Sequence, residues 1–255
     1  MEDYTFSLNI DDTFTFHCTP DVPCFNECCR DLNTFLTPYD VMRLKNALNL
    51  TSTDFLDQYT MTHTGPESGL PIVTLVPRQG NDLVCPFVTE EGCSVYPDRP
   101  SACRIYPLAR AIKRSRETGE IVEYFMLVKE PHCKGHGNGK TQTVRSWIID
   151  QELPVYNTLN DLMMEIISLK NRMLPGSLDQ KSKNILYTTC YDLDKFKTEI
   201  DHGTVTEDLV LSSELLAKIK NDELTRLKFG HIWAKLKLFG IHPDRKTMKE
   251  LEETA

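Results

Sequence analysis

Residues 93–107 read CSVYPDRPSACRIYP, so Cys93 and Cys103 flank a segment that contains two prolines and an arginine. Proline fixes its own backbone angle and restricts the residue before it, which favours turns over long helices or strands. A segment of this kind offers few apolar side chains for a core, so its stability must come from another source, and its two cysteines are the residues that could supply it. We therefore expect cysteine-bound metal to organise this part of the chain.

The other cysteines extend this pattern along the first half of the chain. Eight of the nine fall between positions 18 and 133, and the only later one is Cys190. Eight is twice the number of thiolates that closes one zinc or iron–sulfur site. In a reducing compartment clustered cysteines indicate metal binding, with disulfides or buried thiols as the alternative. The predicted metal ligands are Cys18, Cys24, Cys28, Cys29, Cys85, Cys93, Cys103 and Cys133. We expect Cys190, in the apolar run ILYTTCYDL, to be a small core residue.

Composition limits the class of protein. The 255 residues include 29 basic and 37 acidic side chains, a net charge of −8, which argues against a nucleic-acid-binding surface. The chain has no run of 18 apolar residues that could span a membrane. Its acidic start, MEDYTFSLNIDD, lacks the apolar segment of a secretory signal. We expect a cytoplasmic protein without nucleic-acid or membrane partners, and another protein as its partner; the sequence leaves the oligomeric state open.

Short elements are predicted before residue 140. Thr37 can cap a helix that has Pro38 at its first position, and a second short helix begins at Thr51. Strands are expected at 71–76, 105–114 and 121–129, the last two forming a hairpin around Glu117–Glu120.

Helices dominate the rest of the chain. Apolar residues recur at helical spacing in segments at 141–151, from Pro154 to the break at Leu174–Ser177, at 207–220 and at 222–239. The predicted fold is α+β, with a small metal-organised, cysteine-rich N-terminal half and a mainly helical C-terminal half. We assign residues 14–137 to a cysteine-cluster domain and 138–255 to a helical region, with one continuous domain as the alternative.

The spacing of the cysteines excludes several common metal motifs. The chain has no Cys-x2-Cys knuckle of a zinc ribbon and no bacterial ferredoxin run. Cys24-x3-Cys28 begins the pattern of radical S-adenosylmethionine enzymes, but Asp31 stands where its last cysteine belongs. Neighbouring side chains usually point apart. Cys28 and Cys29 could therefore serve two different sites, or one could bind while the other packs, and both one and two centres are open.

Basic residues and histidines accompany the cysteines. Four thiolates around a divalent ion leave a charge of about −2, which a low-dielectric site must compensate. Candidate cations are Arg30, Arg99, Arg104 and Lys134, with solvated surface charges as the alternative. His17, His132 and His136 lie near cysteines and could replace a thiolate, chiefly Cys18. The loop Gly135–Gly139 lacks the order of a nucleotide-binding loop, and we expect it to be flexible.

The sequence resembles the CxxCxxCC zinc- or iron-chelating family, the YkgJ-like cysteine-cluster proteins. The residues that carry the resemblance are Phe16 with Cys28-Cys29, Cys85-Pro86-Phe87, Cys93–Pro100, Cys103-Arg104 with Pro107, and Cys133-x-Gly135. The family's first cluster is Cys-x2-Cys-x2-Cys-Cys, whereas the gaps here are five and three residues, so the place of Cys18 in that pattern stays open. The resemblance covers about residues 14–137 and implies a metal or iron–sulfur centre.

Two classes of function follow. The first is a protein that holds a [4Fe-4S]-type cluster, or zinc, and acts in redox chemistry, metal handling or assembly. The second rests on the resemblance alone, because relatives with this cysteine set include flagellin lysine N-methylases. It would be an S-adenosylmethionine-dependent protein lysine N-methyltransferase. The sequence contains neither Gly-x-Ser-x-Gly nor His-Glu-x-x-His, which leaves hydrolase chemistry without support.

Overall fold

The computed structural model describes residues 5–30, 32–66, 68–78, 80, 83–114, 121–203, 205 and 208–253. The chain forms two compact units, each built from two separate stretches. Unit 1 comprises residues 1–34 and 75–156, and unit 2 comprises residues 35–74 and 157–255. Both helices and short antiparallel strands are present, which confirms the predicted α+β class. The chain passes between units more than once, whereas the sequence prediction divided it at a single point near residue 137.

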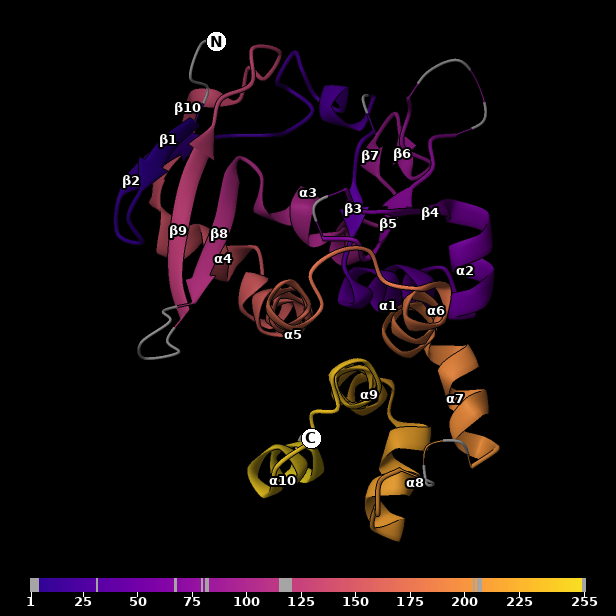
Figure 1. The fold of residues 1–255 in the computed structure, drawn as a ribbon. Helices are drawn as coiled ribbons and strands as arrows, with labels where there is room; N and C mark the ends of the chain where they lie inside the picture. Colours follow the sequence, from indigo (N-terminus) through magenta and orange to yellow (C-terminus); the bar gives the residue numbers. More distant parts are fainter. Residues whose placement is uncertain are drawn as a thin grey trace. The chain divides into compact units, whose positions relative to one another are not determined.

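In the described part of the chain, unit 1 contains three antiparallel sheets, of which the smallest is the pair β6 (Val88–Thr89) and β7 (Gly92–Cys93). Strand β9 (Ile121–Val128) lies between β1 (Thr5–Leu8) and β8 (Leu108–Arg114), as the ribbon shows (Figure 1). Strand β2 (Thr13–Phe16) pairs with β10 (His136–Thr143). The β8–β9 pairing confirms the predicted strands of the hairpin, while its turn at Glu117–Glu120 lies outside the described residues.

Alternation along the strands builds the core of unit 1. Phe14 and Phe16 are both buried in β2, as are Phe125 and Leu127 in β9, because residues two apart in a strand face the same side. Trp147 meets both β2 phenylalanines edge to face, with ring centroids 5.9 Å apart in each pair. These contacts place the predicted amphipathic helix, which begins three residues later than expected because residues 141–143 pair with β2. This helix is α4 (Val144–Asp150).

The cysteines of unit 1 lie on short elements and loops, as predicted. The elements that carry or adjoin them are η1 (Glu27–Cys29), β6 (Val88–Thr89), β7 (Gly92–Cys93), η2 (Tyr96–Asp98) and α3 (Ser101–Ile105). None of these has more than five residues, so their own backbone hydrogen bonds supply little cooperative stability.

The first stretch of unit 2 matches the prediction closely. Helix α1 (Pro38–Ala47) begins after Thr37, whose side chain and that of Asp40 form a reciprocal capping box. It is followed by α2 (Ser52–Tyr59) and by a sheet in the order β3-β5-β4. The strands are β3 (Phe35–Leu36), β4 (Thr60–Thr64) and β5 (Pro71–Leu75).

The second stretch of unit 2 is helical. The expected helices correspond to α5, which begins in unit 1, and to α8 and α9, while α6, η3, α7 and α10 were not predicted. Cys190 is fully buried within η3, as expected for a core residue. The elements are α5 (Leu153–Met173), α6 (Gln180–Leu186), η3 (Tyr187–Tyr191), α7 (Leu193–Asp201), α8 (Ser213–Asn221), α9 (Glu223–Phe239) and α10 (Arg245–Glu253).

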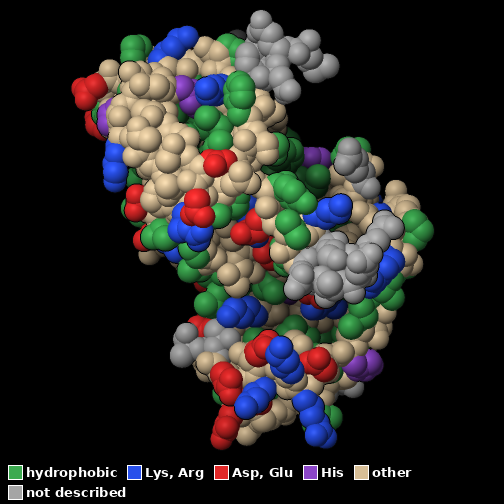
Figure 2. All heavy atoms as spheres, turned by 90° about the vertical axis from the view of Figure 1, so that its left-hand side faces the viewer, with side chains coloured by type: hydrophobic (Ala, Val, Ile, Leu, Met, Phe, Trp, Pro, Cys, Tyr) green, Lys and Arg blue, Asp and Glu red, His purple; other side chains and the backbone are tan. Residues whose placement is uncertain are grey.

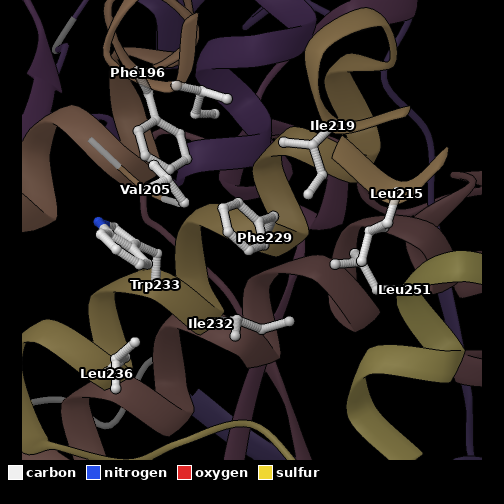
Figure 3. Packing of buried hydrophobic residues seen from close by; sticks show 10 residues of the cluster. Phe196, Val205, Leu215, Ile219, Phe229, Ile232, Trp233, Leu236 and Leu251 are labelled. Atoms are coloured by element: carbon white, nitrogen blue, oxygen red, sulfur yellow. The ribbon is translucent and has the colours of Figure 1, made fainter. Parts of the chain in front are cut away.

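Aromatic packing around α9 forms a core of unit 2 (Figure 3). Phe229 stacks on Phe196 at 6.1 Å and on Trp233 at 6.3 Å. Gly230 lets α9 approach the backbone of η3, because a Cβ at this position would lie 1.9 Å from the carbonyl oxygen of Thr189.

The outer surface of α10 is strongly charged. Lys246 and Glu250, and likewise Lys249 and Glu253, lie one helical turn apart as exposed ion pairs. Figure 2 shows acidic and basic side chains close together at the lower end of the view. Among the described residues, no helix is both long and apolar enough to cross a membrane.

Candidate metal centre

All eight cysteines predicted as ligands lie in unit 1, and none forms a disulfide. Each is exposed or partly exposed, whereas Cys190 is buried. Plain core packing therefore explains Cys190 but not the other eight. Free thiols that reach the surface of short, irregular elements are available as ligands.

The vicinal pair lies in the short helix η1. The Sγ atoms of Cys28 and Cys29 are 4.0 Å apart. The backbone approaches this turn through Asn26, which adopts a left-handed conformation with φ of 67°. The Glu27 amide then donates to the Cys24 carbonyl at 3.0 Å, so Cys24 belongs to the same compact turn.

The first thiol group comprises Cys18, Cys24, Cys28 and Cys133. Pairing of β2 with β10 sets His136 opposite Phe16, and the His17 amide donates to the Gly135 carbonyl at 3.0 Å. The segments that carry Cys18 and Cys133 therefore run beside each other. The Lys134 amide donates to the Cys24 Sγ at 3.0 Å, so Cys24 lies next to the segment that carries Cys133. Cys18 interacts electrostatically with the other three thiols of this group.

The second thiol group comprises Cys29, Cys85, Cys93 and Cys103. The Cys85 amide donates to the Cys29 carbonyl at 2.7 Å. The Cys85 carbonyl accepts from the Val88 amide at 3.3 Å, and Val88 pairs with Cys93 between β6 and β7. Cys103, on α3, interacts electrostatically with Cys29, as does Cys85.

Burial and mutual repulsion raise the pKa of four of these thiols. Burial, followed by the thiols of Cys28, Cys24 and Cys133, raises the pKa of Cys18 to about 11. The hydrogen bond from Cys29 lowers the pKa of Cys28 to about 7, so one thiolate of the vicinal pair forms readily. That thiolate and burial raise the pKa of Cys29. Burial also raises the pKa of Cys85 and Cys93.

The cations near the thiols differ partly from those predicted. Arg99 is confirmed as a neighbour, because its guanidinium interacts electrostatically with Cys103 and Cys93. It also lies 3.8 Å from the centre of the Tyr96 ring. Arg78 was not predicted; it interacts with Cys85 and donates to the carbonyl of Val88 at 2.7 Å. No spacing in the sequence marks Arg78 as a neighbour, since only the fold of the β6–β7 segment brings it there.

The other predicted cations have different partners. Arg104 is 2% exposed, and its guanidinium donates to the Pro97 carbonyl, to the Gln151 carbonyl at 3.0 Å and to the Tyr156 hydroxyl at 3.2 Å. Its role is to hold α3 against the segment where α4 ends and α5 begins. Arg30 forms an exposed ion pair with Glu27 at 3.4 Å. The Lys134 ammonium donates to the Pro131 carbonyl, and it is the backbone amide of Lys134 that donates to the Cys24 sulfur.

The three candidate histidines have partners or packing of their own. The His17 ring nitrogen Nε2 and the Thr19 hydroxyl are 2.9 Å apart, and His132 Nε2 lies 3.6 Å from a Glu130 carboxylate oxygen. His136 packs against the Phe16 ring at 5.3 Å between centroids, and burial lowers its pKa.

The glycine-rich segment is ordered rather than the flexible loop expected. It forms the first half of β10, and the pairing register shifts between His136 and Thr141. A Cβ on Gly135 would lie 2.4 Å from the His17 carbonyl oxygen, and one on Gly139 would lie 2.6 Å from the His17 Cβ. These glycines therefore permit the close approach of two backbones beside Cys18 and Cys133.

The donor set suits a thiolate-bound metal in chemistry and grouping. Across the described residues, no three Cys, His, Asp or Glu side chains already converge in a metal-binding arrangement. The thiols are nevertheless close enough to repel one another as thiolates, and a bound cation reverses that repulsion. Movement of side chains on these half-exposed turns is what ligation requires.

Unit 1 is thus a thiol-rich domain whose short elements collect potential metal ligands. Residues 17–134 match the model of the CxxCxxCC family, described as "Putative zinc- or iron-chelating domain". This match confirms the family resemblance over that range, which includes all eight cysteines. Neither a curated protein nor a solved structure matches the chain.

Proposed function

We propose that this protein binds an iron–sulfur cluster of the [4Fe-4S] type through the cysteines of unit 1 and acts in redox chemistry, metal handling or assembly. The observation that carries the proposal is that two sets of contacts, one for each thiol group, connect eight free thiols to the Cys28–Cys29 turn. The matched family model, which describes zinc or iron chelation, supports the metal class.

Iron is favoured over zinc by the arrangement of the ligands. Zinc ribbons use paired Cys-x2-Cys knuckles, and the chain contains none; its vicinal pair follows gaps of five and three residues instead. Four thiolates hold a [4Fe-4S] cluster, which supplies one-electron chemistry when bound. The chain's own residues would bind it, and Arg78, Arg99 and the Lys134 amide would offset its negative charge.

A reducing compartment follows from this function. Eight surface thiols stay reduced where glutathione and thioredoxin operate, which is the cytoplasm. A redox or assembly role requires another macromolecule to deliver or receive the electron or metal, and we propose a protein in that role. The methyltransferase alternative gains no support from the family match, because the matched description concerns chelation and no transfer reaction.

Anaerobic purification, with iron, sulfide and zinc measured on the same sample as the absorption spectrum, tests the proposal. We expect brown protein with iron, sulfide and an absorption band near roughly 400 nm. Colourless protein that contains zinc would identify the metal as zinc instead of iron and would leave the proposed thiol site unchanged. A metal-free, stably folded chain would refute the proposal.

Two cysteine variants assign the metal to unit 1. Cys93→Ser should lower both the metal content and the melting temperature of unit 1, because metal-binding free energy is folding free energy at such a site. Cys190→Ala is the matched control, since Cys190 is buried in η3 within unit 2 and should leave the metal content unchanged. Unchanged metal content in Cys93→Ser would remove Cys93 from the ligand set.

A further inference from the structure

We infer that unit 1 forms two metal centres of four thiolates each, one from the first thiol group and one from the second. The two centres differ in their affinity for the metal. The inference rests on the proposed function, because it concerns how the same eight thiols divide. Cys28 belongs to the first group and Cys29 to the second, so the turn η1 joins the two centres.

Backbone hydrogen bonds hold the first thiol group together independently of the second. The β2–β10 pairing brings the segment of Cys18 beside that of Cys133. The Lys134 amide then bonds the Cys24 sulfur. Cys28 follows Cys24 within a single compact turn. The group is therefore assembled from the β2 end, η1 and the segment before β10.

A separate set of hydrogen bonds assembles the second thiol group. The amide of Cys85 bonds the carbonyl of Cys29, and the β6–β7 pairing returns the chain to Cys93. Arg99 follows η2 and connects this segment electrostatically to Cys103 on α3. The described contacts between the two groups are the sulfur pair at 4.0 Å and an electrostatic interaction of Cys93 with Cys28.

The charged residues around the two groups have opposite sign. Arg99 interacts with Cys93 and Cys103, and Arg78 with Cys85, so the second group has two cationic neighbours. Cys28 of the first group instead interacts electrostatically with the carboxylates of Glu130 and Glu27, of which Glu27 also pairs with Arg30 at 3.4 Å. Four thiolates around a metal carry net negative charge, which cations stabilise and carboxylates destabilise. The second centre should therefore hold its metal more tightly than the first.

Counting centres in the wild-type chain is the primary experiment. Two clusters, or two zinc ions, are expected per folded chain, and a strong chelator should release them in a fast and a slow phase. No metal at all would refute the proposed function. One centre per chain would refute the present inference and leave the proposed function standing, since the thiols would still bind metal.

Paired variants then test how the thiols divide. Cys24→Ser with Cys133→Ser should abolish the fast phase and retain half of the metal. Cys85→Ser with Cys93→Ser should abolish the slow phase and retain the other half. A variant that keeps half of the metal demonstrates its own folding. Loss of all metal in both pairs, with Trp147 fluorescence still native, would mean a single shared centre.

Arg99→Gln tests the difference in strength. We expect release from the second centre to become at least about tenfold faster, with the fast phase unchanged. Arg145→Gln is the matched control, because Arg145 is exposed and paired with Asp11, and among the described contacts neither residue interacts with a thiol of either group. Equal effects of Arg99→Gln on both phases, or none on either, would refute the assignment of the stronger centre to the second thiol group.

Discussion

Replacing Arg104 should lower the free energy of unfolding of unit 1 more than replacing an exposed arginine of the same unit. The guanidinium is buried and donates to the carbonyls of Pro97 and Gln151 and to the Tyr156 hydroxyl. It also lies 4.6 Å from the centre of the Tyr156 ring. Arg104→Met keeps the length of the side chain and removes every donor, so two carbonyl groups lose their partner.

The magnitude follows from these contacts. A hydrogen bond from a charged donor contributes about 1.5–3 kcal/mol, and a desolvated cation–π contact about 2 kcal/mol. The terms overlap and methionine keeps some packing, so we expect the free energy of unfolding of unit 1 to fall by about 3–4 kcal/mol. The ion pair with Glu152 adds little, because that carboxylate is 73% exposed. The melting temperature of unit 1 should fall by roughly 10 °C.

The two tryptophans permit a clean assay. Trp147 lies in unit 1 and donates to the Ile105 carbonyl at 3.0 Å, whereas Trp233 lies in unit 2. In a Trp233→Phe background, fluorescence during urea unfolding therefore reports on unit 1 alone. Arg145→Met is the matched control, because its partner Asp11 and the arginine itself are both exposed, and it should leave the midpoint of urea unfolding nearly unchanged. If Arg104→Met and Arg145→Met unfold at the same urea concentration, Arg104 does not hold α3 in place.

Three further perturbations have defined outcomes. Burial lowers the pKa of His231 from 6.5 to about 4, so the unfolded chain takes up a proton at a higher pH than the folded chain does. The free energy of unfolding of unit 2 should therefore fall by about 3 kcal/mol as the pH falls from 6.5 to 4. Urea unfolding followed by Trp233 fluorescence measures this loss, and His231→Gln should make the stability of unit 2 less dependent on pH. Gly230→Ala should lower the melting temperature of unit 2, because its Cβ would meet the Thr189 carbonyl oxygen. Gly135→Ala should reduce metal content and the Trp147 transition together, since its Cβ would displace the His17 carbonyl.

Each of these would be contradicted by a specific result. An identical pH profile in His231→Gln would mean that carboxylates, not this imidazole, set the acid sensitivity of unit 2. Wild-type melting of Gly230→Ala would show that α9 and η3 can separate without cost. Gly135→Ala with full metal content would show that the approach of β2 and β10 does not position Cys18 and Cys133.

Local signals explain which parts of the fold were predictable. Thr37-Pro38 and Asp40 specify a helix start through hydrogen bonds within four residues, and α1 begins there. The β8–β9 strands follow from apolar runs that flank a turn signal. By contrast, α7 and α10 have strongly polar sequences, and their apolar residues are few, among them Phe196 in α7 and Leu251 in α10. Their helical state depends on packing against other helices of unit 2.

The candidate cysteines of the site could be named from the sequence, but the residues that surround them could not. Residue type and number identified the cysteines, because few other residues bind soft metals. The neighbours of a thiol depend on how the backbone turns, as with Arg78 and Cys85, which are only seven residues apart but are brought together by the fold of the β6–β7 segment. Arg104 illustrates the reverse error: it adjoins Cys103 in sequence, yet the helical turn of α3 directs its guanidinium to Gln151 and Tyr156.

Pairing within unit 2 should set the metal affinity of unit 1, because the stretch 35–74 interrupts the second thiol group between Cys29 and Cys85. Closing a free loop of that length would cost about 4 kcal/mol. Here Phe35 pairs with Thr74 between β3 and β5, and the Leu75 amide donates to the Thr34 carbonyl at 3.0 Å. Nearer the cysteines, the Leu32 amide donates to the Leu83 carbonyl at 2.8 Å.

The β3–β5 pairing thus brings the two halves of the second group together before metal binds. Leu75→Pro removes the backbone amide at the end of β5 that donates to the Thr34 carbonyl, and should weaken this pairing. We expect it to speed metal release from the second thiol group while the first, which lies on β2, η1 and the segment before β10, keeps its release rate. The first group serves as the internal control. Equally faster metal release from both groups would show that the variant unfolds unit 1 as a whole. Unchanged metal release from both groups would show that the β3–β5 pairing does not help to bring the second thiol group together.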